Sequence, residues 1–213
     1  GTSTPESRLA VAAAEYERIE KESKDDEVRR GALLLAADLY EQAKETDRAL
    51  EVYRRYVAYF PKPLELALES RYKIAQVYKT RNNTNAYLGE LKQILALDAH
   101  AGRERTDRTR YLGATAALHI TEPLYEQLVA IKLVQPFEKN LLKKRNAMKA
   151  ATDAFGKLVD YGVGDVTAAA TYYLAEIYYH FNKALTESER PKNLNAAELG
   201  SRELTFTPGP VAA

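Results

Sequence analysis

The sequence Ala-Ala-Asp-Leu-Tyr at residues 36–40 recurs twice more in this chain of 213 residues, as Ile-Ala-Gln-Val-Tyr at 74–78 and Leu-Ala-Glu-Ile-Tyr at 174–178. Each copy has the order small or apolar, Ala, polar, aliphatic, Tyr. On a helix, the alanine lets a neighbouring helix approach closely, while the aliphatic and tyrosine side chains fill the groove beside it. Internal similarity of this kind indicates a repeat architecture built from equivalent helices.

Helical periodicity extends outward from these copies over most of the chain. Between about residues 5 and 195, apolar residues recur at three- and four-residue steps without sustained alternation. Polar residues, glycine or proline interrupt the pattern at 24–26, 46–47, 61–63, 82–85, 98–102, 135–136 and 161–164. These breaks predict a series of antiparallel helix pairs instead of one compact bundle.

The segment after the first copy contains the most specific signal. With Tyr40 as the last signature position of one helix, a small residue follows at Ala49, an aromatic at Tyr53 and a proline at Pro61. In these offsets the chain resembles the tetratricopeptide repeat (TPR) family, whose period is about 34 residues. The resemblance implies an all-α fold, a TPR-like α-solenoid of antiparallel helix pairs whose first helices line a concave groove.

Later parts of the chain depart from the pattern. In the second repeat, Tyr87 stands where a small residue is usual, and Ala99 stands where a proline is usual. Two unusually long helices are predicted at 103–134 and 137–161, with a kink or break at Pro123. We therefore expect a single repeat domain over residues 5–199 with an elongated central helical hairpin. Its repeats lie at 5–24 (partial), 30–63, 68–100, 103–161 (degenerate and long) and 165–199 (partial).

The two ends of the chain lack the repeat pattern. Gly1-Thr2-Ser3 looks like a cloning or processing remnant, and residues 200–213 have no helical period, as expected of a disordered or vector-derived tail. A repeat array without a capping helix exposes an apolar face. We therefore expect homodimer or crystal contacts through the exposed repeat ends.

Composition and motifs disfavour several classes of protein. A net charge of +1 gives no overall attraction to nucleic acid or membranes, and no apolar stretch is long enough to span a bilayer. Without cysteine there is no disulfide framework and no thiolate metal site. The sequence has no Walker A loop and no GxGxxG, GxSxG or HExxH motif. We expect no enzyme activity, no catalytic residue and no cofactor.

Two local features of the sequence resemble ligand sites. His100, His119 and His180 have no second histidine or cysteine at helical spacing, so we expect no metal site. The stretch 162–165 predicts a glycine turn with Asp165 as the N-cap of the next helix, in preference to an anion site.

The TPR resemblance places partner-binding positions on the first helix of each repeat whose signature is intact. Tyrosine suits such positions because it offers a large area and a hydroxyl at little cost in rotamer entropy. In chaperone-binding members of the family, lysine and asparagine at groove positions bind the carboxy-terminal carboxylate of the partner. This chain has other residues at those positions, which argues against an adaptor that binds chaperone tails. The predicted groove positions are Leu34, Asp38 and Gln42, then Tyr72, Gln76 and Lys79, and finally Tyr172, Glu176, Tyr179 and His180.

A basic segment suggests a different partner. Lys139, Lys143, Lys144, Arg145 and Lys149 lie on one predicted helix, and Arg103, Arg105, Arg108 and Arg110 lie on the one before it. Together they predict a locally positive central hairpin. Because acidic residues interrupt them and aromatics are sparse, a solvated helix face is favoured, followed by contact with an acidic partner and then with RNA or lipid headgroups.

A second resemblance concerns the biological setting. The sequence Tyr-Val-Ala-Tyr-Phe-Pro at 56–61, the tyrosine-rich second helices and the slightly long period resemble TPR proteins of the bacterial envelope. This implies a non-catalytic protein–protein interaction scaffold in the periplasm or at the outer membrane, binding a peptide or partner helix in its groove as a fragment of a larger envelope protein. The alternatives are a nucleic-acid-binding helical repeat using the basic hairpin, a cytoplasmic location, and an enzyme assembled from separate helices.

Overall fold

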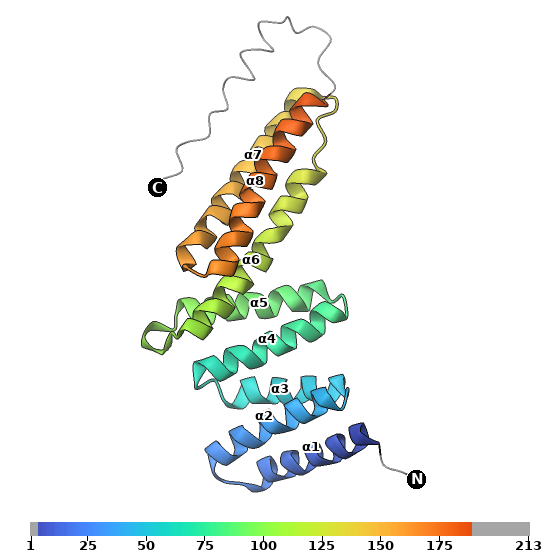
Figure 1. The fold of residues 1–213 in the computed structure, drawn as a ribbon, viewed down its shortest axis with the longest axis vertical. Coiled ribbons are helices and arrows are strands. Elements are labelled where there is room, and N and C mark those ends of the chain that lie inside the picture. The colour runs from blue at the N-terminus through green and yellow to red at the C-terminus, as the bar shows by residue number, and fades with distance from the viewer. Residues whose placement is uncertain (1–3, 189–213) are drawn as a thin grey trace, which may run out of the picture.

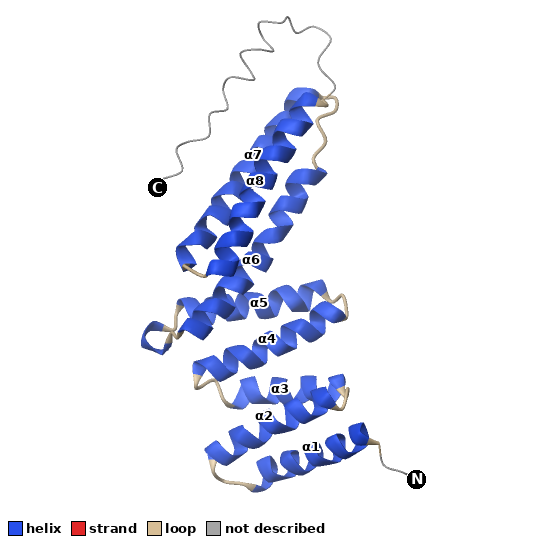
Figure 2. Cartoon of the chain, viewed as in Figure 1, coloured by secondary structure: helices blue, strands red, loops and turns tan. Residues whose placement is uncertain are grey.

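The computed structural model describes residues 4–188, and within this range the chain forms helices and no strand (Figure 2). The predicted tail at 200–213, the end of the predicted 165–199 repeat and residues 1–3 lie outside the described residues. The helices are α1 (Pro5–Glu22), α2 (Asp26–Gln42), α3 (Thr46–Tyr59), α4 (Leu64–Thr80), α5 (Thr84–Ala99), η1 (Gly102–Glu104), α6 (Asp107–Ala130), α7 (Phe137–Leu158), η2 (Val159–Tyr161) and α8 (Gly164–Thr186).

The helices form two parts, which α6 connects. Helices α1 to α5 lie one after another across the long axis of the molecule, and we call them the helical stack (Figure 1). Helices α6, α7 and α8 run side by side along that axis, and we call them the three-helix bundle (Figure 1). Because α6 packs against α4 and α5 as well as α7 and α8, it connects the bundle to the stack.

Side-chain caps explain why several helices begin where the sequence predicts. Thr4, Asp25 and Asn83 each accept a hydrogen bond from a backbone N–H in the first turn of α1, α2 and α5. Such a bond satisfies one of the N–H groups that have no partner within the helix. At α6, Thr106 and Thr109 cap each other reciprocally.

The start of α8 differs from the prediction. Its N-cap is Val163, which makes no side-chain cap hydrogen bond, and Asp165 lies inside the first turn. The reason is Gly162, whose φ of +64° ends the preceding 3₁₀ turn and lets the helix begin at Gly164. The carboxylate of Asp165 still lies near the positive end of the helix dipole.

Of the kink or break predicted at Pro123, the break is absent, because α6 continues through this residue to Ala130. Proline removes one backbone hydrogen bond from a helix interior. Both halves of α6 are held by packing, since Leu112 and Ala116 are buried against the stack and Leu128 is buried in the bundle. Tertiary packing on both sides of the proline therefore outweighs the local preference.

The three signature segments are not equivalent. Ala37 and Ala75 are fully buried between neighbouring helices, as predicted, but Ala175 is exposed. Helix α8 buries Val166, Ala170, Ile177 and Phe181 instead, because it packs against α6 and α7 together. The prediction of one common helix environment was therefore wrong for the third copy.

A polar network ties the first three helices together inside the stack. The hydroxyl of Tyr40, which is buried on α2, donates to Glu17 Oε2 of α1 at 2.6 Å. Arg55 of α3 donates to Glu17 Oε1 at 2.5 Å. Burial raises the pKa of the Glu17 carboxyl, but the bonds from Tyr40 and Arg55 outweigh it and hold that pKa below its ordinary value of 4.5.

We expect Glu17→Gln to lower the free energy of unfolding at pH 7 by about 1–2 kcal/mol, because hydrogen bonds to a charged group are lost. Since the folded pKa of Glu17 is lowered, its contribution is complete above pH 4.5 and is lost as pH falls through the folded value. Urea unfolding of the wild type and of Glu17→Gln at pH 7 and near pH 3 measures this difference in the free energy of unfolding. Glu15→Gln, on the exposed side of α1, serves as control. A wild-type advantage that stays constant with pH would contradict the assignment.

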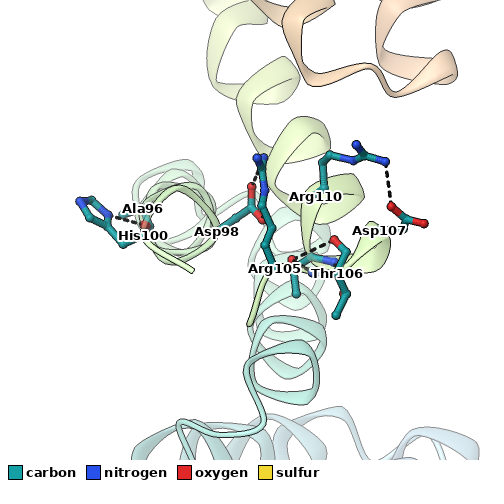
Figure 3. Close-up of polar contacts among 8 residues, drawn as sticks. Ala96, Asp98, His100, Arg105, Thr106, Asp107 and Arg110 are labelled. Carbon is teal, nitrogen blue, oxygen red and sulfur yellow. Dashed lines mark hydrogen bonds and ion pairs between the residues drawn. The ribbon is translucent and has the colours of Figure 1, made fainter. Parts of the chain in front are cut away.

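A buried carboxylate fixes the junction between α5 and α6 (Figure 3). Asp98, which is 1% exposed, accepts hydrogen bonds from Arg105 Nε at 3.1 Å and from Arg105 Nη2 at 2.8 Å. Its side chain lies against Gly113 of α6, where an added Cβ would be 2.6 Å from Asp98 Oδ2. The close approach of the two helices therefore requires glycine at this position.

Candidate partner-binding site

An aromatic cluster spans the contact between α6 and α8. Tyr125 of α6 meets Tyr173 and His180 of α8 edge-on, with ring centroids 5.3 and 5.7 Å apart. Tyr172 and Tyr179 extend the cluster along α8, at 5.7 Å from Tyr173 and 5.6 Å from His180. Rings at these distances and angles attract one another, so the cluster is a stable surface.

Carboxylates lie within the cluster and accept hydrogen bonds from its tyrosines. Glu122 Oε1 accepts from the Tyr173 hydroxyl at 3.3 Å, and Glu122 Oε2 lies 2.9 Å from His119 Nδ1. Glu176 Oε2 accepts from the Tyr125 hydroxyl at 3.4 Å and lies 3.6 Å from His180 Nε2. Each carboxylate thus bridges α6 and α8.

These contacts fix the ionisation of the site. Burial raises the pKa of Glu122, but hydrogen bonds from His119 and Tyr173 outweigh it, so the pKa stays below its ordinary value and the group is negative at neutral pH. Burial, reinforced by the nearby carboxylates, raises the pKa of Tyr125 and Tyr173. Both tyrosines therefore keep their hydroxyl protons and act as donors.

Two rings of the cluster face solvent. Tyr172 is 60% exposed and Tyr179 is 59% exposed, and Glu126 of α6 is also exposed. Tyrosine is enriched at protein interfaces, where it combines apolar area with a hydroxyl. We call this surface the acidic aromatic face, and it consists of Glu122, Tyr125, Glu126, Tyr172, Tyr173, Glu176, Tyr179 and His180.

Hollows border the acidic aromatic face on two sides. One, of about 280 Å³, lies between the α4–α5 turn and α6, and its lining includes Lys79, Tyr87 and Glu126. Another, of about 470 Å³, lies where α6 and α8 end, and its lining includes Lys144 and Lys183. The negative surface is therefore limited by lysines at both margins.

The predicted groove residues fall into groups with different surroundings. Tyr172, Glu176, Tyr179 and His180 come together on the acidic aromatic face, and Lys79 lines the hollow beside it. Tyr72 and Gln76 are half-buried on α4. On α2, Leu34 packs onto the core of the stack, whereas Asp38 accepts a hydrogen bond from Gln42. Helix α2 packs against α1 and α3, so its residues are not brought to α8 (Figure 1).

Lys144 is not part of a solvated basic face, which corrects the sequence prediction. Its side chain is only 2% exposed, and its ammonium donates to Leu128 O at 2.8 Å and to Ile131 O at 2.7 Å. These carbonyls lie at the C-terminal end of α6, where helix carbonyls have no partner within the helix. Lys144 therefore caps α6 from the neighbouring helix α7.

The remaining basic residues do not form one positive surface. Lys139, Lys143, Arg145 and Lys149 are exposed on α7, where Lys149 pairs with Asp153. The arginines lie at the other end of α6, a helix of 24 residues and therefore about 36 Å long. Arg105, Arg108 and Arg110 are paired there with Asp98, Glu69 and Asp107. The basic residues predicted to form one positive hairpin are thus divided between two ends of the bundle, and Arg105, Arg108, Arg110 and Lys149 are paired with carboxylates.

Sequence reasoning missed the residues that α6 contributes to the face. Glu122, Tyr125 and Glu126 lie around Pro123, where a kink or break was predicted, so their common helical spacing was not recognised. The i, i+3 pair of His119 and Glu122 was the available signal. Among residues 4–188, no group of three His, Asp or Glu side chains is arranged to share a metal ion. None of the helices in this range has both the length and the apolar character needed to cross a membrane.

Comparison of the chain with protein-family models, with curated proteins and with solved structures gives no match.

Proposed function

We propose that this chain is a non-catalytic interaction scaffold that binds a peptide or helix of a protein partner on its acidic aromatic face. The observation that supports this most strongly is the pair of exposed rings, Tyr172 and Tyr179, which contact the half-buried rings of the same cluster. A preorganised aromatic surface binds a partner without the cost of ordering its own side chains.

The proposal includes an assignment of family and setting. The offsets from Tyr40 through Ala49 and Tyr53 to Pro61 support a TPR-like α-solenoid for the helical stack, with the three-helix bundle as its extension. The tyrosine-rich segment 56–61 supports a bacterial envelope protein of the periplasm or outer membrane. In this proposal the partner contacts the three-helix bundle, and the helical stack supports the bundle.

Site-specific photo-crosslinking tests the proposal in cells that express the chain. The photoreactive residue p-benzoylphenylalanine replaces Tyr172 or Tyr179, and in a matched control it replaces Leu142, which is exposed on α7. We expect adducts with a protein partner from the two α8 positions and not from position 142. Equal adducts from all three positions, or none from any, would contradict the proposal. An adduct with a second copy of this chain would indicate a homodimer instead.

A further inference from the structure

Tyrosine rings in the helical stack have cations of the same chain above them. Arg54 lies 5.5 Å from the ring centroid of Tyr78, and Lys79 lies 5.7 Å from that of Tyr87. A cation within about 6 Å of a ring face is attracted by its quadrupole. The same arrangement occurs for Arg48 on Tyr40 and Arg29 on Tyr59 and, at the first turn of α6, for Arg108 on Tyr111.

The exposed tyrosines of α8 are different. Tyr59, Tyr172 and Tyr179 are the exposed tyrosines among residues 4–188, and Arg29 lies 6.0 Å from the ring of Tyr59. Within the same range, no Lys or Arg lies over Tyr172 or Tyr179, whose ring contacts are with Tyr173 and His180. No cation of residues 4–188 therefore competes with a partner for the electron-rich faces of these two rings.

Negative charge reinforces that preference. Glu176 lies between the two tyrosines on α8, and its side chain is 30% exposed. Glu126 is exposed on the neighbouring helix, and Glu122 is held ionised. A carboxylate next to an aromatic ring favours a guanidinium or ammonium over a neutral or anionic group.

We propose that the acidic aromatic face binds a cationic segment of a protein partner, with arginine or lysine side chains placed over Tyr172 and Tyr179 and paired with Glu126 and Glu176. This inference rests on the proposed function and specifies the chemistry of the partner. Lys79 and Lys183 at the margins confine the cationic contacts to the centre of the face.

The helix geometry predicts the spacing of the two cations. Tyr172 and Tyr179 are seven residues apart on α8, which corresponds to about 10 Å along the helix axis. A peptide in the polyproline II conformation has three residues per turn and rises about 3.1 Å per residue, so side chains three residues apart lie on the same side of the peptide, about 9 Å apart. A peptide with arginine at every third position therefore places successive cations over the two rings.

Fluorescence anisotropy with a labelled peptide of this design, at low salt and with the full chain, tests the inference. We expect Tyr172→Leu and Tyr179→Leu each to weaken binding by about 2- to 5-fold, and the double variant by about 10-fold. Glu126→Gln weakens it by about 2-fold, since an exposed ion pair is worth little. Tyr172→Phe retains the ring and binds like the wild type. Tyr59→Leu is the matched control, because Arg29 already lies over that ring.

Three results would overturn the inference. These are unchanged binding by the double variant, equal binding of a peptide with glutamate in place of arginine, and tighter peptide binding when the chain's own Arg190, Lys192 and Arg202 are replaced by glutamine. The last result would assign the face to the chain's own C-terminal segment. Crosslinking of an acidic or apolar partner segment from positions 172 and 179 would leave the scaffold function intact and contradict only the cationic partner.

Discussion

Replacement of Gly113 by alanine is expected to lower the free energy of unfolding by about 2–4 kcal/mol, measured by urea denaturation. The added Cβ would lie 2.6 Å from Asp98 Oδ2 and 2.9 Å from Asp98 Cβ. Asp98 cannot simply turn away, because its Cβ is fixed by the backbone of α5 and its carboxylate is held by Arg105. Either the helices separate or the buried carboxylate loses its partner, and both changes destabilise the junction that orients α6.

Two comparisons separate this steric effect from a general effect of glycine replacement. Gly89 lies on α5 with nothing within 4 Å of its added Cβ, so Gly89→Ala is expected to stabilise the chain by about 0.5–1 kcal/mol. Asp98→Gly removes the contacting atoms, so Gly113→Ala in that background loses most of its effect, which a double-mutant cycle measures. Similar losses in both backgrounds would show that the contact with Asp98 is not the cause.

The helices could be predicted from the sequence because their boundaries depend on neighbouring residues. Asp25 and Asn83 cap the helices that follow them, as the polar breaks at those positions indicated. The long helices predicted at 103–134 and 137–161 also follow from local periodicity, although α6 and α7 are shorter than predicted, at 107–130 and 137–158. The periodicity of the sequence did not predict how α8 packs. Helix α8 contacts α6 and α7 at once, and these contacts decide which side of it is buried.

The candidate site could be predicted in part for the same reason. Tyr172 and Tyr179 were identified because the resemblance to TPR proteins places partner-binding positions on their helix, and both side chains are exposed in the structure. Tyr125 and Glu122 were missed, because only the packing of α8 onto α6 gives them a role. Lys144 was misassigned, since it lies between exposed Lys143 and Arg145, and nothing local distinguishes a buried lysine from its solvated neighbours.

The capping role of Lys144 leads to the second large effect. Lys144→Met keeps a long flexible side chain but removes the donor to Leu128 O and Ile131 O. We expect the free energy of unfolding to fall by about 2–4 kcal/mol, because two hydrogen bonds from a buried charged group to carbonyls at the end of α6 are lost. Lys143→Met, which changes an exposed neighbour, is expected to stay within about 0.5 kcal/mol of the wild type.

The dependence on pH distinguishes this role from simple filling of space. Burial lowers the pKa of Lys144 in the folded chain below its ordinary value of 10.5. Between the lowered pKa of Lys144 in the folded chain and its ordinary value of 10.5, the unfolded chain binds more protons than the folded chain. The stability that Lys144 contributes therefore increases as pH rises from the folded pKa to 10.5, and it is smallest below the folded pKa. The advantage of the wild type over Lys144→Met should therefore grow towards pH 10.5. Tyrosines that titrate in the same range affect both proteins equally, so they cancel in this difference. A methionine variant as stable as the wild type at every pH would show that the amino group of Lys144 contributes nothing beyond its volume.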